Sequence, residues 1–370
     1  MTNKVCCIFN TPSHYRERIY RRIEEAFDCD WYFEDTDNNV NEFDTGCLEN
    51  VKRLHSTAHG RFYSVKGLAS LIKNPNYTHY IVAGLSRNFS TMMFMLLKGL
   101  FYRDKKVFLW THGFYGKESS FEAMWKKLLY KYADGLLIYG DYACDIMKRR
   151  GFDECKLHPI HNSLDYDAQL KIRKRISPEP IYGEHFGNNN PTLVFIGRLS
   201  KVKRLDMLIQ SVADLKISGR EINLTLVGGG SESDLLKTLS TQLGIEKQVW
   251  FYGPCYDELT NARLIYNADL CVAPGNIGLT AMHVMMFGCP AISHNDFANQ
   301  MPEFEAIKDG KTGTFFRRDS QKSLNNAIER WFSQESYNRE SIRQFCFDEI
   351  DRNWTPNYQI NILKSLIPEA

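Results

Sequence analysis

Short apolar runs alternate with segments of helical pattern along most of this 370-residue chain, and this alternation constrains the fold more than any other feature. The predicted strands cover residues 5–9, 30–33, 79–83, 107–110 and 135–139, and then 192–196, 222–227, 249–252, 269–273 and 290–293. Continuous apolar strands separated by helices are typical of a parallel β-sheet that helices cover on both faces. The sequence therefore predicts an α/β protein built from doubly wound parallel sheets.

A polar stretch rich in Pro and Asn, residues 173–190, separates the two series of strands. At roughly 100–200 residues per domain, the length fits two domains. We expect a first domain over residues 1–172, a linker over 173–190, a second domain over 191–345 and a final helix over 346–370. Two such domains normally face a central cleft at the carboxyl ends of their strands, where ligands bind.

The overall composition excludes several classes of protein. The chain has 46 Lys and Arg against 44 Asp and Glu, and a net charge of +2 gives no reason to expect a nucleic-acid partner. Its 10 cysteines include no Cys-x-x-Cys pair, so they are predicted to be reduced, mostly buried thiols of a cytoplasmic protein. No run of 18 apolar residues is long enough to span a membrane.

The most informative segment follows the strand at residues 192–196. Gly197 ends that strand, and a cationic loop then carries Arg198, Lys201, Lys203 and Arg204 before a helical pattern begins. Arg offers a bidentate fork and Lys a mobile point charge, so a di- or polyanion is the ligand that this loop predicts. A solvated basic loop is the alternative.

Two glycine-rich strand-to-helix junctions accompany this loop. The first contains Gly229, and the second precedes and opens a predicted helix with Gly275, Asn276, Gly278, Leu279, Thr280 and His283. Glycine lets the backbone approach a ligand closely, and helix N-termini favour anions. His283 is predicted to have a functional role, although a lone helical His is often structural. The dinucleotide fingerprint Gly-x-Gly-x-x-Gly is absent, which argues against a nicotinamide oxidoreductase.

These segments together resemble the retaining family 4 glycosyltransferases of the GT-B fold, which act in bacterial polysaccharide and glycan biosynthesis. The resemblance covers most of residues 155–335, including 160–165 and 309–313, and is weaker at 10–16 and 110–113. It implies two Rossmann-like domains, a nucleoside-diphosphate sugar on the second and an acceptor on the first. It also implies that the final helix crosses back to the first domain.

The resemblance also assigns roles to particular residues of the second domain. Arg198 and Lys203 are expected to neutralise the donor diphosphate. The family's Glu-x7-Glu motif falls on Gly275 and His283, so both motif carboxylates are missing, although His283 still offers a hydrogen bond to a ribose hydroxyl. Glu305 aligns with another recurring acidic position near the donor. The missing glutamates bear on the identity of the donor and, less strongly, on activity itself.

In the first domain, the resemblance points to residues that follow two predicted strands. His112 follows the strand at 107–110 and is predicted to contact the transferred sugar or the acceptor. Ser13, His14 and Arg16 follow the first strand and are predicted on the acceptor side. For His112, the alternative is a strand-end side chain that caps backbone groups.

The reaction that the resemblance implies is hexosyl transfer with retention of anomeric configuration, in which the leaving phosphate helps to deprotonate the acceptor. It needs no protein nucleophile, and we expect no metal or other cofactor. Asp-x-Asp pairs, which chelate metal in other glycosyltransferase folds, occur at Asp28/Asp30, Asp35/Asp37 and Asp165/Asp167. Three such pairs are unremarkable in a chain with 24% charged residues.

Residues 92–131 mix apolar and basic side chains, and residues 98–150 hold 11 Lys and Arg against 6 Asp and Glu. Such a surface suits the anionic inner face of a cell membrane and a lipid-linked glycan acceptor. Two ordinary domain helices with a solvated Lys face are the alternative. For the whole chain, the rival functions are a non-catalytic nucleotide-sugar-binding or partner subunit and a GT-B-like sugar epimerase or phosphorylase.

Overall fold

A computed structural model describes residues 4–35, 42–334 and 338–368. The chain divides into two compact units: Met1–Asp165 with Trp354–Ala370, and Tyr166–Asn353. The expected linker at 173–190 instead lies inside the second unit, where it follows α5 (Tyr166–Arg173) and contributes α6 (Ile181–Phe186). A hydrogen bond from the Tyr182 hydroxyl to the Leu264 carbonyl (2.7 Å) holds this polar stretch, and one from Gln169 Nε2 to Glu258 (2.8 Å) holds α5 just before it.

The first unit contains a seven-stranded sheet in the order β3-β2-β1-β6-β7-β8-β9, in which every neighbouring pair is parallel. The strands are β1 (Lys4–Phe9), β2 (Cys29–Glu34), β3 (Val51–Leu54), β6 (Tyr77–Ala83), β7 (Lys106–Thr111), β8 (Gly135–Ile138) and β9 (Leu157–Pro159). An antiparallel hairpin of β4 (Ser56–His59) and β5 (Phe62–Val65) lies apart from this sheet. The central strands are buried on both faces, as their continuous apolar runs predict.

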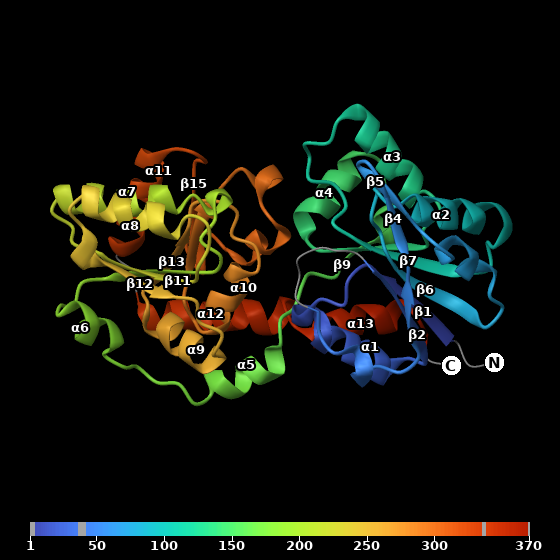
Figure 1. The fold of residues 1–370 in the computed structure, drawn as a ribbon, viewed down its shortest axis with the longest axis horizontal. Helices are drawn as coiled ribbons and strands as arrows, with labels where there is room; N and C mark the ends of the chain where they lie inside the picture. Colours follow the sequence, from blue (N-terminus) through green and yellow to red (C-terminus); the bar gives the residue numbers. More distant parts are fainter. Residues whose placement is uncertain (1–3, 36–41, 335–337, 369–370) are drawn as a thin grey trace. The chain divides into compact units, whose positions relative to one another are not determined.

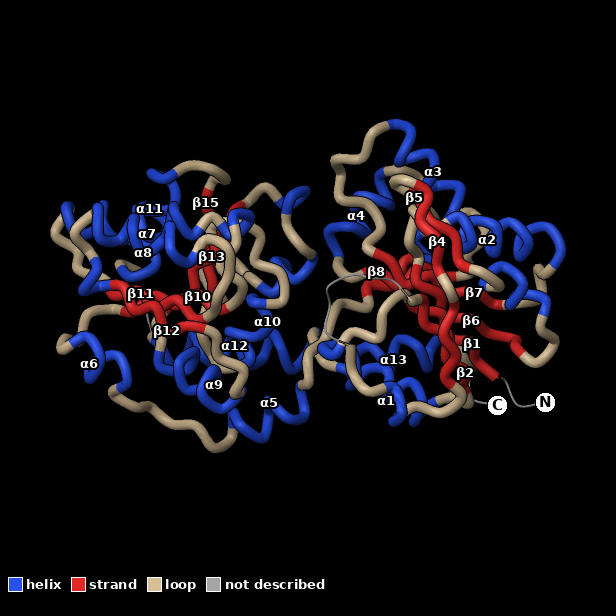
Figure 2. Tube along the Cα trace, in the orientation of Figure 1, coloured by secondary structure: helices blue, strands red, loops and turns tan. Residues whose placement is uncertain are grey.

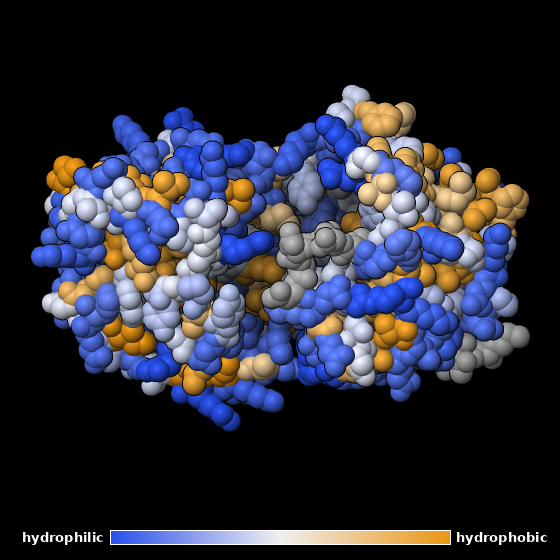
Figure 3. Space-filling model, in the orientation of Figure 1, coloured by the Kyte–Doolittle hydropathy of each residue, from blue (hydrophilic) through white to orange (hydrophobic). Residues whose placement is uncertain are grey.

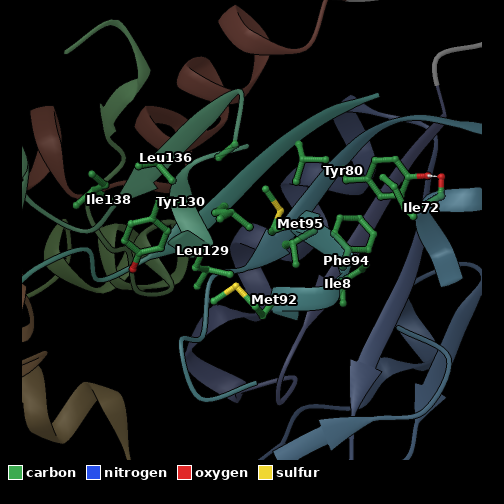
Figure 4. Close-up of a cluster of buried hydrophobic side chains, with 14 of the residues drawn as sticks. Ile8, Ile72, Tyr80, Met92, Phe94, Met95, Leu129, Tyr130, Leu136 and Ile138 are labelled. Atoms are coloured by element: carbon green, nitrogen blue, oxygen red, sulfur yellow. Dashed lines mark hydrogen bonds between the residues drawn. The ribbon is translucent and has the colours of Figure 1, made fainter. Parts of the chain in front are cut away.

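Helices cover both faces of this sheet (Figure 1). On one face α1 (Glu17–Ala26) packs beside α13 (Pro356–Leu366), and on the other lie α2 (Phe89–Phe101), α3 (Ser120–Tyr130) and α4 (Asp141–Arg149). The two faces carry separate cores. The core under α2 and α3 includes Met95 and Leu129 (Figure 4), whereas α13 adds Leu363 to the opposite core.

The second unit contains a six-stranded parallel sheet in the order β12-β11-β10-β13-β14-β15, shown in red between blue helices in Figure 2. Its strands are β10 (Thr192–Ile196), β11 (Asn223–Val227), β12 (Val249–Gly253), β13 (Leu270–Ala273), β14 (Ala291–His294) and β15 (Gly313–Phe316). One face carries α7 (Leu205–Ile217), α8 (Ser233–Gln242) and α11 (Gln321–Phe332), and the other carries α9 (Glu258–Asn267), α10 (Thr280–Met286) and α12 (Arg339–Asn353). Both sheets are doubly wound, which confirms the predicted fold class.

A single final helix over 346–370 was expected, but the structure has two helices in this segment. Residues up to Asn353 belong to α12 of the second unit, and α13 begins at Pro356 in the first. Pro356 occupies the start of α13 and the Thr355 side chain accepts a hydrogen bond from the Tyr358 N–H, which defines a new helix start.

Several large apolar side chains are exposed on α2 and α3, where Figure 3 shows hydrophobic surface. They are Phe89, Met93, Leu100 and Phe101 on α2 and Phe121, Met124 and Leu128 on α3. Among the described residues, no helix is both long and apolar enough to cross a bilayer.

Candidate active site

The strand order of each sheet reverses beside its first strand, which is β1 in the first sheet and β10 in the second. At this switch point the connections of two neighbouring strands, β1 and β6 or β10 and β13, run to opposite sides of the sheet. In the second unit these strands are β10 and β13, which lie side by side. Gly197 and Arg198 follow β10, and Gly275 follows β13 after Pro274. Doubly wound sheets bind ligands outside the carboxyl ends of the strands at this switch point.

The second unit brings the predicted basic loop against the glycine loop that follows β13. The Gly275 N–H donates to the Lys203 carbonyl at 2.9 Å, and a Cβ at Gly275 would overlap the Val202 carbonyl oxygen. Position 275 therefore requires glycine in this backbone, because no side chain, glutamate included, has room there. The same close approach recurs at Gly228, where a Cβ would overlap the Gly197 carbonyl.

Arg198 and Lys203 differ in how they are held. The Lys203 Nζ donates to the backbone carbonyl (2.7 Å) and to Oδ1 (3.0 Å) of Asn276, a predicted donor-site residue. Burial and the neighbouring charge of Arg198 lower the pKa of Lys203 to about 8, although Glu303 opposes them. Arg198 is exposed, and its side chain has no hydrogen bond or ion pair within the described parts of the chain. A fixed Lys beside an uncompensated Arg suits an anion.

His283 forms a hydrogen bond with a carboxylate on a neighbouring helix. Its Nε2 lies 3.0 Å from Oε1 of Glu258 on α9, and the same oxygen accepts a hydrogen bond from Gln169 of α5. Burial opposes ionisation of Glu258, but its hydrogen bond with His283 and the charge of His283 contribute to a net lowering of its pKa. His283, the residue that the resemblance aligns with a motif glutamate, is therefore anchored to a carboxylate on another helix.

The remaining predicted donor-site residues lie around the same loops. Thr280 donates to the Ile196 carbonyl at 3.1 Å, and the Gly229 carbonyl accepts from the Leu199 N–H at 2.9 Å. Gly278 and Leu279 immediately precede α10, and Gly278 adopts a positive φ of 56°. Glu305 lies in the short helix Pro302–Ala306, but the carboxylate whose charge acts on Lys203 is Glu303, which sequence reasoning passed over.

In the first unit a cavity of about 240 Å³ opens at the switch point between β1 and β6. Three predicted residues, Ser13, Arg16 and His112, line it together. His14 does not line it and is exposed. Sequence reasoning missed other lining residues, because as members of apolar runs or of an amphipathic helix they carry no separate signal. These include Trp110, Lys126, Tyr130 and Tyr139.

His112 packs between two tyrosines, with ring centroids 4.5 Å from Tyr139 and 5.9 Å from Tyr115. Its Nδ1 is buried and has no hydrogen-bond partner among the described residues. Burial lowers the pKa of His112 to about 4, and the charges of Arg16 and Lys126 contribute to this shift. The imidazole is therefore neutral near pH 7, able to donate one hydrogen bond and accept another.

Members of two of the Asp-x-Asp pairs make structural contacts. Asp30 forms an ion pair with Lys4 at 2.8 Å, and Asp35 accepts hydrogen bonds from Ser56 and His55. Asp37 lies outside the described residues. Across the described ranges, no group of three or more His, Cys, Asp or Glu side chains is arranged to hold a metal ion.

Sequence comparisons match part of this chain to known glycosyl transferases. Residues 183–345 match the family described as "Glycosyl transferases group 1". A D-inositol 3-phosphate glycosyltransferase of Nocardia farcinica is 31% identical over 137 residues, which are 34% of this chain and 29% of that protein. The chain thus matches less than a third of that relative's length.

Solved structures match nearly the whole chain. The lipopolysaccharide outer core galactosyltransferase WaaB superposes with a TM-score of 0.72 at 17% identity, covering 98% of this chain and 99% of WaaB. Anabaena HepE in complex with UDP gives a TM-score of 0.71 at 15% identity with the same coverage. The chain has the GT-B fold, and its second unit carries the sequence pattern of group 1 glycosyl transferases.

Proposed function

We propose that this protein is a retaining glycosyltransferase that moves a hexose from a nucleoside-diphosphate sugar to a glycan or lipid-linked glycan acceptor. The observation that carries the proposal is the pairing of a fixed Lys203 with an uncompensated Arg198 at the carboxyl end of β10. This pair lies within the region that matches the group 1 family. The names of the similar proteins, a transferase and a UDP complex, support the same donor class.

The proposed chemistry follows from where charge develops. Cleavage of the sugar–phosphate bond leaves negative charge on the departing diphosphate and an oxocarbenium-like sugar. Preorganised cations aimed at that charge stabilise the transition state more than the ground state. Arg198 and Lys203 supply this charge, so we propose that the reaction needs no metal. The leaving phosphate accepts the proton of the acceptor hydroxyl, and His112 offers a neutral hydrogen bond to the sugar.

Substitution of the two cations tests the proposal. We expect Arg198→Ala and Lys203→Ala each to abolish most turnover, while circular dichroism shows an intact fold. Arg317→Ala is a matched control, because Arg317 is an exposed arginine of the same unit that follows β15. Near-normal kinetics in both variants would remove the assignment. Activity that EDTA abolishes and manganese restores would contradict the metal-free mechanism.

Two alternative functions, a nucleotide-sugar-binding subunit and an epimerase, are distinguished from a glycosyltransferase by their products. A nucleotide-sugar-binding subunit, motivated by the absent glutamates, would bind donor without releasing nucleotide. An epimerase of the same fold would convert the sugar without an acceptor. Release of a nucleoside diphosphate in proportion to a glycosylated product excludes both.

We also propose contact with an anionic membrane surface through residues 92–131. Two of the exposed apolar residues, Met124 and Leu128 of α3, line a groove with Lys127 and Lys131. Lys98 does not contribute, because it is buried in an ion pair with Asp134 at 2.9 Å. Binding to vesicles containing phosphatidylglycerol should be lost in high salt and in Lys127→Glu/Lys131→Glu. No binding at low salt would rule the contact out.

A further inference from the structure

Arg16 is a charged residue of the first unit that is buried without a neutralising partner among the described residues. Its side chain is only 6% exposed, and its Nη2 has no hydrogen-bond partner. Within the described residues, no ion pair or side-chain hydrogen bond compensates its charge. Burying an unpaired cation costs several kcal/mol in general, so such a group is retained where a partner arrives from outside.

Aromatic rings hold the guanidinium of Arg16 without neutralising it. The Cζ atom lies 4.6 Å from the ring centroid of Trp110, 5.1 Å from that of Phe9 and 5.2 Å from that of Tyr20. Cation–π contacts of this kind fix the position of a guanidinium and offset part of its desolvation. They leave its N–H groups available, because a ring face is a poor substitute for an anionic acceptor.

The lining of the cavity beside Arg16 includes several hydrogen-bond donors and no carboxylate. The indole Nε1 of Trp110 is buried without a partner, as is Nδ1 of His112. Lys126 also lines the cavity but is already paired with Glu118 at 2.9 Å, so Arg16 supplies the uncompensated charge. At about 240 Å³ the cavity is smaller than the roughly 300–1,000 Å³ typical of drug-sized ligands, which suits one small group or sugar unit.

We propose that this cavity binds an oxyanion, a carboxylate or a phosphate, through the guanidinium of Arg16 and the indole N–H of Trp110. An anion there completes the hydrogen bonds of both buried donors and neutralises the buried charge. The identification of this oxyanion as a group carried by the acceptor rests on the proposed glycosyltransferase function. It narrows the acceptor class to phosphorylated or carboxylated glycans.

Titration calorimetry of the full chain, saturated with UDP to fill the donor site, tests the site directly. The probes are inorganic phosphate, glucuronate and its neutral counterpart glucose. We expect phosphate or glucuronate to bind at least about tenfold more tightly than glucose, and Arg16→Met to remove that preference. Arg149→Met is the control, because Arg149 is exposed on α4 and makes no described side-chain contact. The better of the two anionic probes identifies the group.

A second variant covers the case in which Arg16→Met does not fold. Trp110→Phe keeps the ring beside Arg16 and removes only the Nε1 donor, and we expect it to weaken oxyanion binding severalfold without affecting glucose. Unchanged oxyanion binding in a folded Arg16→Met, or in Trp110→Phe, would overturn the proposal, as would equal binding of glucose and glucuronate. The outcome is separable from the proposed function, since Arg198→Ala should lose UDP binding and retain Arg16-dependent oxyanion binding.

Discussion

At the scale of single residues, the donor side of the proposed site depends on a lysine whose charge is adjustable. The pKa of Lys203 lies at about 8, lowered by burial and by Arg198. A bound diphosphate favours the protonated amine, so binding takes up a proton once the free site is deprotonated. We predict that the affinity for UDP falls as the pH rises above about 8, measured by calorimetry in buffers of different ionisation enthalpy. Affinity that stays constant to about pH 9.5 would contradict this assignment.

The second prediction at this scale concerns Gly275, which the sequence resemblance aligns with a motif glutamate. Because a Cβ there would overlap the Val202 carbonyl and crowd the Lys203 backbone, Gly275→Ala should displace the loop that carries Lys203. We expect UDP affinity to fall about tenfold or more and the melting temperature to fall. Gly183→Ala, in α6 of the same unit, is the control and should leave UDP binding unchanged. Unaltered binding in Gly275→Ala would show that the loop is not held as described.

At the scale of elements, a buried carboxyl joins three segments of the first unit. Glu34, at the end of β2, accepts hydrogen bonds from the Tyr63 hydroxyl of β5 (3.0 Å) and from Nδ2 of Asn88 (2.7 Å). Asn88 also caps α2, because its Oδ1 accepts from the backbone N–H groups of Ser90 and Thr91. Burial raises the pKa of Glu34 to about 7, against the opposing effect of these hydrogen bonds.

The raised pKa of Glu34 predicts a pH dependence of stability with a definite sign. The folded protein keeps a proton that the unfolded chain loses above about pH 4.5, so this stabilisation is present below about pH 4.5 and is lost as the pH rises through about 7. Glu34→Gln cannot ionise. We predict that the free energy of unfolding of Glu34→Gln, measured with urea and taken relative to that of the wild type, increases by on the order of 1–3 kcal/mol from about pH 5 to about pH 8. A constant difference would contradict the raised pKa.

The elements also show what the sequence predicts well. The ten predicted strands exist because buried parallel strands are continuous apolar runs, and β10 coincides with its predicted range. The hairpin β4–β5 and the short β3 escaped prediction, because each strand has only four residues, is mostly only partly buried or exposed, and mixes polar with apolar side chains instead of forming a continuous apolar run. In the candidate site, Arg198 and Lys203 have a sequence signal in their spacing. The carboxylates Glu258 and Glu303 have none, since only the folded structure brings them to His283 and Lys203.

At the scale of the whole molecule, the last helix completes the first unit although it follows the second in sequence. Gln359 of α13 is 1% exposed, and it accepts from the Ser163 hydroxyl (2.6 Å) and donates to the His161 carbonyl (3.0 Å). Chain segments nearly two hundred residues apart are thus fixed by one side chain, an arrangement that no local pattern predicts. The expected single final helix was wrong for a local reason, because Thr355 and Pro356 start a new helix after α12 ends at Asn353.

We predict that Gln359→Ala destabilises the first unit by about 1–3 kcal/mol, because it leaves a buried hydroxyl and a buried carbonyl unsatisfied. Urea unfolding followed by tryptophan fluorescence measures this, since four of the six tryptophans, Trp31, Trp110, Trp125 and Trp354, belong to that unit. Asn361→Ala, an exposed position on the same helix, serves as the control. If both variants unfold at the wild-type urea concentration, α13 does not hold the unit as described.

The central claim is that the second unit binds a nucleoside diphosphate through Arg198 and Lys203. The most direct measurement is the thermal stabilisation of the full chain by UDP, GDP, ADP, CMP and TDP, each with the wild type and with Arg198→Ala. A ligand at 100 times its dissociation constant stabilises by roughly 2.7 kcal/mol, which a melting curve resolves. We predict that one diphosphate shifts the wild type and not the variant, which would also identify the base. No shift with any of the nucleotides would contradict the donor site and the glycosyltransferase function built on it.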